Sequence, residues 1–348
     1  MKPTFFLFLS VFFLFSCKKE SKPVQNDWQN ISSNVRYKED ANVFNLKSGK
    51  FIYEIPTGKL PFKRVMLLNA SLVGYFTELG LENKIIGISS PEYVYSERIH
   101  QLIQEGKIQN IGNEQKYDVE KIIALKPDAV FTNYIASFDN TYDLIKKNGI
   151  EIIFLDEYLE QNPLEKSKYL LVFGKLLGVE KEADLKFNEI QNSYTTLKTL
   201  AQKGQKRPVV LANEMYGNQW FLPGGKTSLA QFIADANAKY INAENADSKA
   251  IPMSFEEVYA KSRDAEFWVN VGNHQFKKEL LQINPNYAKM KVFNTGTLFT
   301  VSGKEKAKSN DYFESGVVRA DLILKDYIKI FHPELLPEYN LTYLKELK

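Results

Sequence analysis

The sequence predicts an α/β protein made of two Rossmann-like lobes that one long rigid helix joins, with a ligand cleft between the lobes. Three patterns support this prediction. Short buried-type strands alternate with amphipathic helices in both halves of the chain, which is typical of parallel sheets covered by helices. A sustained apolar stripe from 183 to 201 separates the two halves. The halves also share a repeated helix–strand motif.

Residues 1–16 predict a secretory signal peptide. Lys2 supplies the positive charge, residues 5–15 are mostly Phe and Leu, and small Ser16 precedes Cys17. This apolar run is shorter than the about 20 residues that cross a bilayer, which disfavours a retained transmembrane helix. A cysteine directly after the cleavage point resembles a lipobox, which implies acylation of Cys17. An ordinary signal peptide with an incidental cysteine is the alternative.

We expect the lipid on Cys17 to hold an exported bacterial lipoprotein at the periplasm-facing membrane surface. Lys19 and Glu20 resemble the charged export signals of some outer-membrane lipoproteins, so the outer surface is the alternative location. Residues 17–33 are polar and lack periodicity, which predicts a flexible tether to the lipid.

The composition is that of an ordinary globular protein and excludes several functions. With 348 residues, 44% of them hydrophobic, the chain can form two domains with separate cores. The formal charge is +3 and the lysines are scattered, which disfavours a nucleic-acid partner. Cys17 is the only cysteine and there are three histidines, so a zinc site or a Ser-His-Asp triad is disfavoured. We therefore expect no catalytic residue, metal site or cofactor.

The residues before the apolar stripe predict two units, a small β-hairpin and an α/β lobe. Residues 34–60 predict an N-terminal β-hairpin, in which VRYKEDANVFNL and KFIYEI flank a turn at 47–49. Residues 61–178 predict an N-terminal α/β lobe. Its strands are RVMLLN, KIIGIS, DAVFTN and IEIIFLD, and its helices include SLVGYFTELG, VEKIIAL and NTYDLIKKNG.

Residues 179–204 predict the connecting helix. Its apolar positions recur at intervals of three and four residues, and Gly204 ends it. These positions are Ala183, Phe187, Ile190, Tyr194, Leu197 and Ala201.

Residues 205–348 predict a C-terminal α/β lobe that repeats the first. Its strands include RPVVLANEM, AEFWVNVG and KVFNTG, and its last helix is expected from 312 to 330. The string DVEKIIALKPDAVF (118–131) aligns with SFEEVYAKSRDAEF (254–267). Duplicated lobes create a cleft between them, and such clefts bind ligands.

Several strings, in this order, resemble the helical-backbone periplasmic binding proteins, which deliver iron–siderophore complexes, haem or cobalamin to ABC importers. They include LLNASLVGYFTELGLENKIIGIS, IGNEQKYDVEKIIALKPDAVF, WFLPGGKTSLAQFIADA and SFEEVYAKSRDAEFWV, and the match runs from about 64 to 333. The resemblance implies a lipid-anchored substrate-binding protein that captures an iron–siderophore-type chelate and delivers it to an ABC permease dimer. Haem or cobalamin is the alternative ligand.

Candidate ligand-binding residues follow the predicted strands, because ligands of open α/β sheets bind at the carboxyl ends of the strands. Aromatic side chains with a polar tip suit a large, partly planar, amphipathic ligand. The candidates are Tyr93, Tyr95, Asn133, Tyr134, Glu157 and Tyr158 in the first lobe, and Tyr216, Trp220, Asn273, Phe299 and Tyr312 in the second. Packing beneath a loop is the alternative for each of them.

Arginine is scarce in the chain, with only Arg36, Arg64, Arg98, Arg207, Arg263 and Arg319. Arg64 and Arg207 lie at strand beginnings, and Arg263 lies between a helix and a strand on the side away from the cleft. A ligand with several free carboxylates requires guanidinium contacts. Citrate-type siderophores are therefore disfavoured.

Glu120 and Glu256 take the same place in the two aligned strings, VEKI and FEEV. The resemblance implies that they dock into arginine pockets of the permease subunits. The local alternative is that an acid in the first turn of a helix interacts with the helix dipole. Glu257 fits a capping box with Ser254 instead.

Two other classes of function compete with an importer subunit. A lipoprotein enzyme on this scaffold is disfavoured, because three scattered histidines supply no nucleophile–base pair. A surface lipoprotein that binds its ligand without a permease partner is the second alternative.

Overall fold

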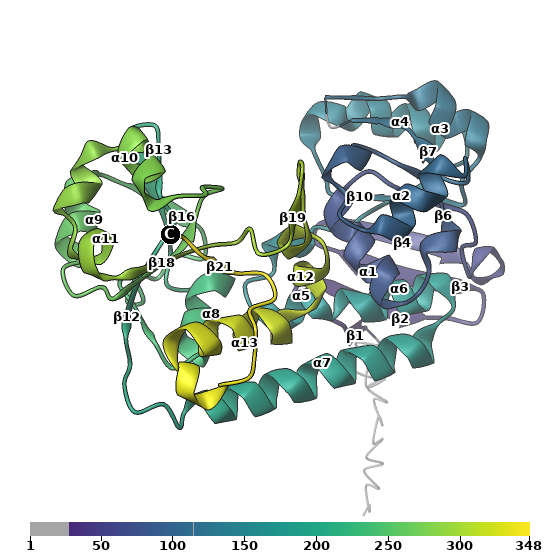
Figure 1. Ribbon diagram of the computed structural model, residues 1–348. Helices are drawn as coiled ribbons and strands as arrows, with labels where there is room; N and C mark the ends of the chain where they lie inside the picture. The colour runs from purple at the N-terminus through teal and green to yellow at the C-terminus, as the bar shows by residue number, and fades with distance from the viewer. Residues whose placement is uncertain (1–27, 114) are drawn as a thin grey trace, which may run out of the picture.

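The protein consists of two α/β lobes joined by the helix α7 (Glu180–Ala201), as seen in a computed structural model that describes residues 28–113 and 115–348 (Figure 1). The predicted signal peptide 1–16 and Cys17 lie outside the described residues. Within the described ranges, no helix has both the length and the apolar character needed to cross a membrane.

Five parallel strands form the sheet of the N-terminal lobe, in the order β11-β10-β5-β6-β7. Runs such as AVFT are buried along their whole length because helices cover both faces of the sheet. The strands are β5 (Val65–Leu67), β6 (Ile85–Ile88), β7 (Gln109–Asn110), β10 (Ala129–Thr132) and β11 (Glu151–Phe154). The helices are α1 (Val73–Glu78), α2 (Glu97–Gln104), α3 (Val119–Leu125), α4 (Asp139–Lys147), α5 (Pro163–Ser167) and α6 (Tyr169–Leu177). A small hairpin joins β8 (Gly112–Asn113) to β9 (Lys116–Tyr117).

The sheet of the C-terminal lobe has the order β15-β12-β17-β18-β21. The order β18-β17-β12-β15 repeats the order β11-β10-β5-β6 of the first lobe, which supports the predicted duplication. The parallel strands are β12 (Val209–Ala212), β15 (Lys239–Tyr240), β17 (Phe267–Val271) and β18 (Thr297–Thr300), and β21 (Lys345–Glu346) pairs antiparallel at the edge.

Smaller elements complete the C-terminal lobe. A second sheet contains β13 (Met215–Tyr216), β14 (Gln219–Pro223) and β16 (Ala250–Met253), and a hairpin contains β19 (Glu305–Lys306) and β20 (Ser309–Asn310). The helices are α8 (Ser228–Asp235), α9 (Phe255–Lys261), α10 (Leu280–Ile283), α11 (Lys291–Thr295), α12 (Ser315–Val318) and α13 (Ala320–Phe331).

The helix α7 belongs to both hydrophobic cores. Phe187 and Ile190 pack in the core of the first lobe, whereas Tyr194 and Leu197 pack in the core of the second. One continuous apolar stripe therefore packs against both lobes, as its spacing predicts. Together with the two parallel sheets, this confirms the predicted fold class.

The N-terminal segment forms a four-stranded antiparallel sheet rather than the predicted hairpin. The string VRYKEDANVFNL is not one strand, because it turns back after Asp40, whose N–H donates to the Val43 carbonyl at 2.9 Å. Asp and Asn favour such turns. The strands are β1 (Gln29–Asn30), β2 (Val35–Glu39), β3 (Val43–Ser48) and β4 (Phe51–Pro56), paired in this order.

Near its end the chain returns to the first lobe, although the sequence predicts that 205–348 belong to the second. The helix α12 packs against α1 so closely that a Cβ on Gly74 would lie 2.2 Å from the Glu314 carbonyl oxygen. Val318 belongs to the core of the first lobe. The predicted helix 312–330 is consequently divided at Arg319 into α12 and α13.

Candidate functional site

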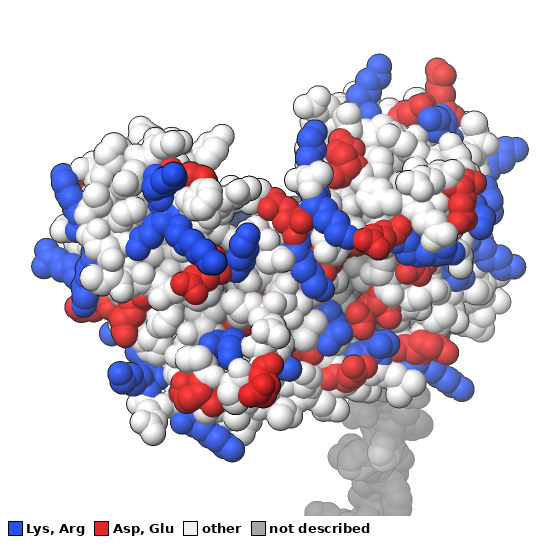
Figure 2. Space-filling model, viewed as in Figure 1, with Lys and Arg blue, Asp and Glu red and all other residues white. Residues whose placement is uncertain are grey.

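A cavity of about 600 Å³ lies between the two lobes. Figure 2 shows a hollow between the two lobes, on the side of the molecule that faces away from α7. The cavity lies at the carboxyl ends of β5, β12 and β17, where open α/β sheets bind ligands. Its lining comes from both lobes: Asn69, Ala70, Ser71, Tyr93, Asn213, Asn270, Val271, Gly272, Asn273, Val301, Ser302, Glu305, Lys308, Asn310, Tyr312, Phe313 and Glu314.

An asparagine pair lies at the carboxyl ends of two neighbouring strands in each lobe. The register of β5 and β10, extended by two residues beyond Leu67, places Asn69 opposite Asn133, and the two amides hydrogen bond to each other. The register of β12 and β17, extended by one residue, places Asn213 opposite Asn270. We call these two sets the amide pairs. They place amide groups at the same edge of both sheets, on opposite sides of the cavity.

The buried carboxylate of Glu157 holds lining residues of the first lobe in position. Glu157 is 3% exposed and accepts hydrogen bonds from the Ser71 hydroxyl at 2.6 Å and from Asn133 Nδ2 at 2.9 Å. Burial raises the pKa of Glu157, and these hydrogen bonds oppose that shift. Asn69 in turn accepts from the Ser71 N–H at 2.9 Å. Glu157 and Asn133 therefore position Asn69 and Ser71, which line the cavity.

Two buried tryptophans pack behind the second amide pair, Asn213 and Asn270. Asn213 and Asn270 have φ values of 59° and 53°, a left-handed conformation that Asn adopts more readily than most residues. Trp268 Nε1 donates to the Asn213 carbonyl at 2.5 Å, and Trp220 stacks on Trp268 at 5.4 Å between ring centroids. Two buried indoles therefore lie directly behind the cavity wall.

The β19–β20 hairpin of the second lobe crosses to the first lobe beside the cavity. Lys306 forms an ion pair with Glu97 at the start of α2 and lies 4.9 Å from the centroid of the Tyr95 ring. Lys308 lies 6.0 Å from the Tyr93 ring. Since Lys308 also lines the cavity, the hairpin forms one wall of the cavity and joins the lobes there.

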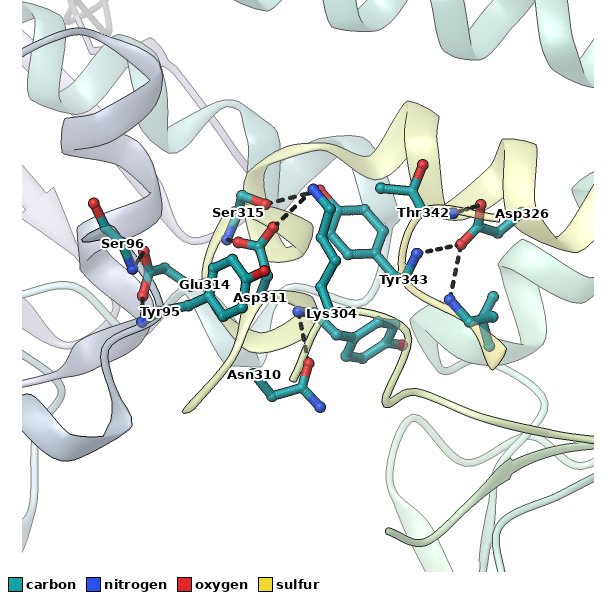
Figure 3. Close-up of polar contacts among 12 residues, drawn as sticks. Tyr95, Ser96, Lys304, Asn310, Asp311, Glu314, Ser315, Asp326, Thr342 and Tyr343 are labelled. Atoms are coloured by element: carbon teal, nitrogen blue, oxygen red, sulfur yellow. Dashed lines mark hydrogen bonds and ion pairs between the residues drawn. The ribbon is translucent and has the colours of Figure 1, made fainter. Parts of the chain in front are cut away.

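Glu314 makes a second connection between the lobes. Its buried carboxylate accepts hydrogen bonds from the backbone N–H groups of Tyr95 at 2.6 Å and Ser96 at 3.1 Å, as Figure 3 shows. Burial raises the pKa of Glu314 to about 7, and the negative charge of Asp311 adds to this shift. Lys304 lies 3.2 Å from Asp311 and balances part of that charge.

Replacement of Glu314 by Gln is expected to change how stability depends on pH. The pKa of Glu314 is about 7 in the folded protein, above its ordinary value of 4.5. Between pH 4.5 and pH 7 the folded protein therefore binds more protons than the unfolded chain. The contribution of Glu314 to stability is therefore full below pH 4.5 and is lost as the pH rises through 7, a change of about 3 kcal/mol. Between pH 5 and pH 8, urea unfolding should show a larger loss of stability in the wild type than in Glu314→Gln, and the difference between the two losses is the contribution of Glu314.

Glu338→Gln, an exposed substitution, is the control for this comparison and should follow the wild type. If Glu314→Gln and the wild type changed in parallel between the two pH values, the raised pKa of Glu314 would be contradicted.

The structure brings only some of the predicted ligand-binding residues together. Tyr93, Asn273 and Tyr312 line the cavity. Asn133 and Glu157 lie one layer behind it. The other six predicted residues, Tyr95, Tyr134, Tyr158, Tyr216, Trp220 and Phe299, do not line it.

These six residues lie elsewhere for identifiable reasons. Trp220 is buried in the core of the second lobe because it alternates inward along β14. Phe299 is buried there because the predicted strand KVFNTG forms the helix α11 instead, so Phe299 lies within β18, where three successive residues are buried. Tyr134 packs against Phe51 of the N-terminal sheet. Tyr95 lies beneath Lys306 on the outer side of the hairpin, and Tyr158 and Tyr216 are exposed to solvent.

Asn69, Asn213 and Asn270 line the cavity but are missing from the sequence prediction. A signal for two of them exists in the sequence: the first predicted strand of the N-terminal lobe, RVMLLN, ends in Asn69, and that of the C-terminal lobe, RPVVLANEM, has Asn213 near its end. The hairpin residues Glu305 and Lys308 had no comparable signal, because no local pattern indicates that this hairpin reaches the other lobe.

Glu120 and Glu256 are both exposed and both take the second position of a seven-residue helix, α3 and α9. The capping box of α9 is made by Ser254 and Glu257, as predicted, and leaves Glu256 out of it. In Figure 1 the helices α3 and α9 lie at the outer ends of the two lobes, away from α7.

No group of three or more His, Cys, Asp or Glu side chains suited to hold a metal ion occurs in ranges 28–113 and 115–348. His274 pairs with Glu214 at 2.7 Å, and neither side chain lines the cavity.

The sequence of this chain matches the profile of a known protein family. Residues 65–304 match the sequence profile of the family described as periplasmic binding protein. An uncharacterised lipoprotein of Methanocaldococcus jannaschii is 24% identical over 284 residues, which cover 79% of this chain and 66% of that protein. A second uncharacterised lipoprotein of this organism is 23% identical over 321 residues, covering 89% of this chain and 78% of that protein.

Solved structures share the fold. A periplasmic binding protein from Veillonella parvula superposes with a TM-score of 0.64 at 14% identity, covering 85% of this chain and 99% of that chain. A periplasmic haem-binding protein of Vibrio cholerae gives a TM-score of 0.62 at 14% identity, covering 78% of this chain and 99% of that chain. A possible iron-binding protein from Staphylococcus epidermidis gives 0.60 at 16% identity, with coverage of 78% and 99%.

Proposed function

Since this chain belongs to the periplasmic binding protein family, we propose that it is the substrate-binding subunit of an ABC importer. It captures an iron–siderophore-type chelate in the cleft between its lobes and delivers the chelate to a permease dimer. The observation that carries this proposal is the cavity of about 600 Å³, lined by both lobes at the carboxyl ends of their strands.

The chemistry of the cavity supports a chelate as its ligand. Tyr93, Tyr312 and Phe313 offer aromatic surface, and asparagine and serine side chains offer hydrogen bonds. Structures with this fold include proteins described as binding haem, iron or nickel. Haem and cobalamin are the alternative ligands within this function.

The proposal includes a lipid anchor on Cys17. The names of two M. jannaschii relatives, both called lipoproteins, support it, as does the signal-like N-terminus. The anchored protein faces the periplasm, and a location on the outer surface without a permease partner is the alternative.

Ligand binding should quench the tryptophan fluorescence of the protein. Trp268 donates a hydrogen bond to the carbonyl of Asn213, which lines the cavity, so a coloured metal chelate in the cavity lies close to Trp268 and Trp220. Titration with ferric siderophores, haemin and cyanocobalamin should give saturable quenching at one ligand per protein for one of them.

The third tryptophan provides the control. Trp28 lies beside Arg36 in the N-terminal sheet region, so Trp28→Phe should retain the quenching. Absence of binding to every chelate, checked by equilibrium dialysis, would contradict the proposed function.

A further inference from the structure

The lining of the cavity carries almost no net charge. It contains five asparagines and two serines, but only one cation, Lys308, and two acids, Glu305 and Glu314. No arginine or histidine is found among these lining residues. A ligand with several anionic groups would lose its hydration on entering the cavity and would gain only one cation in exchange.

The three charged lining residues are also engaged with the protein. Both carboxylate oxygens of Glu314 accept backbone hydrogen bonds from the start of α2. Glu305 accepts a hydrogen bond from Asn273 Nδ2. Lys308 lies over the ring of Tyr93. Asn69 and Asn310 likewise use both ends of their amides within the protein, and Asn273 donates to Glu305. The amides that remain to recognise a ligand are therefore mainly those of Asn213 and Asn270.

The second amide pair presents a hydrogen-bond acceptor on one strand and a hydrogen-bond donor on the neighbouring strand. Asn213 Nδ2 donates to the Phe221 carbonyl at 3.0 Å, which leaves its Oδ1 as an acceptor. Asn270 Oδ1 accepts from the Tyr327 hydroxyl at 2.9 Å and its Nδ2 donates to the Tyr312 hydroxyl, which leaves the second N–H of Nδ2 as a donor. An acceptor and a donor side by side complement a group that itself has both a C=O and an N–H or O–H.

We propose that this cleft selects uncharged metal chelates whose surface carries amide or hydroxamate groups, and that it rejects polyanionic chelates of the same metals. The proposal rests on the proposed function and specifies its ligand class. The second amide pair is the specificity-determining group, and the absence of arginine from the lining is the reason for rejection. Uncharged ferric trihydroxamates and amide-bearing corrinoids belong to the selected class, whereas ferric citrate and haem with its two propionates do not.

Matched ligands test this selection in the full mature protein. Calorimetry at pH 7.5 should compare an uncharged ferric trihydroxamate with ferric citrate, and cyanocobalamin with its monocarboxylic acid derivative, with haemin as a further anionic ligand. We expect at least one uncharged ligand to bind, and its anionic counterpart to bind at least about tenfold more weakly, because one unpaired buried charge costs more than about 1.4 kcal/mol.

The two proposals fail in different ways in this experiment. If an anionic chelate bound as tightly as its uncharged counterpart or more tightly, or if only haemin or ferric citrate bound, the inferred ligand class would be overturned and the importer function would stand. If none of the chelates bound, both proposals would be overturned.

Substitution Asn270→Asp tests the amide pair directly. Asp has the same shape, still accepts from Tyr327 and also tolerates the φ of 53°, but it replaces the Nδ2 donor by a charged oxygen. We expect the uncharged chelate to bind at least about tenfold more weakly to this variant. Asn245→Asp is the matched control, because its oxygen accepts from the Asp247 N–H at 2.9 Å outside the cavity.

Melting temperatures are measured on both variants, because Asn270→Asp keeps the bond from Tyr327 but loses the one to Tyr312. Unchanged affinity in Asn270→Asp would overturn the role of the second amide pair. The ligand comparison in the unmodified protein decides the ligand class even if Asn270→Asp folds poorly.

Discussion

A protein with both Glu120→Gln and Glu256→Gln is expected to bind its ligand and to fail in transport. Both side chains are exposed, at equivalent first-turn positions of α3 and α9, and neither lines the cavity. If they dock into arginine pockets of the permease, the two charges become buried in the complex. Loss of a charge pair that binding buries costs about 2 kcal/mol or more, so transport should fall more than about tenfold.

The measurement is ATPase stimulation and uptake in an importer reconstituted with its permease. The loss in the double variant should be largest at low ionic strength, because salt screens the charges that guide association. Ligand affinity and melting temperature are measured on the same samples and should stay close to the wild-type values.

The double variant Glu182→Gln and Glu189→Gln is the control, since it removes the same charge from the exposed face of α7. Two results would count against docking. Normal transport would remove the role of Glu120 and Glu256 in docking. A marked loss of stability would favour the local alternative, in which the two acids serve their helices.

Loss of the Asp326 carboxylate is expected to destabilise the folded protein strongly. Asp326 is fully buried on α13 and accepts hydrogen bonds from the N–H groups of Thr342, Tyr343 and Leu344 at 2.8, 2.7 and 2.9 Å (Figure 3). It also accepts from the Tyr339 hydroxyl at 2.7 Å. One side chain therefore satisfies successive backbone groups of the C-terminal tail.

Asp326→Ala leaves three of these N–H groups without a partner, two of them in a buried setting, and should lower the free energy of unfolding by about 3 to 5 kcal/mol. The same variant should expose the tail, including β21, to proteolysis. Urea unfolding and limited proteolysis measure the two effects. Asp184→Ala, on the exposed face of α7, should change stability little. A loss below about 1 kcal/mol in Asp326→Ala would show that the tail is held by its apolar contacts instead.

The local patterns of the sequence were sufficient for the overall architecture. Strand–helix alternation, the spacing of apolar residues in α7 and the capping box of α9 are properties of neighbouring residues, and they predict most elements where the structure has them. The predicted strand KVFNTG is wrong, since these residues form the helix α11 and the strand β18 follows them. The resemblance between the halves also follows from the sequence, and the strand orders agree with it. The hairpin at 34–60 was wrong in detail, because a turn at Asp40 divides what resembles one strand.

Which residues form the walls of the cavity depends on contacts between residues that are far apart in the chain. The sequence places Trp220 and Phe299 near strand ends, but only the packing of the sheets decides that both rings face the core. Register alone places Asn213 beside Asn270 across two strands. The hydrogen bond from Tyr95 to Glu314 joins residues 219 positions apart, and no local periodicity encodes it.

The sequence by itself thus determined the two lobes, their connecting helix, the signal-like N-terminus and the paired glutamates, since each depends on short-range spacing and composition. The tertiary structure decided which strand-end side chains line the cavity, that the β19–β20 hairpin forms one of its walls, and that its lining carries little net charge and is rich in amides. The physical reason is that side-chain direction at the end of a strand is set by sheet register and by packing against the other lobe, and both are properties of the whole fold.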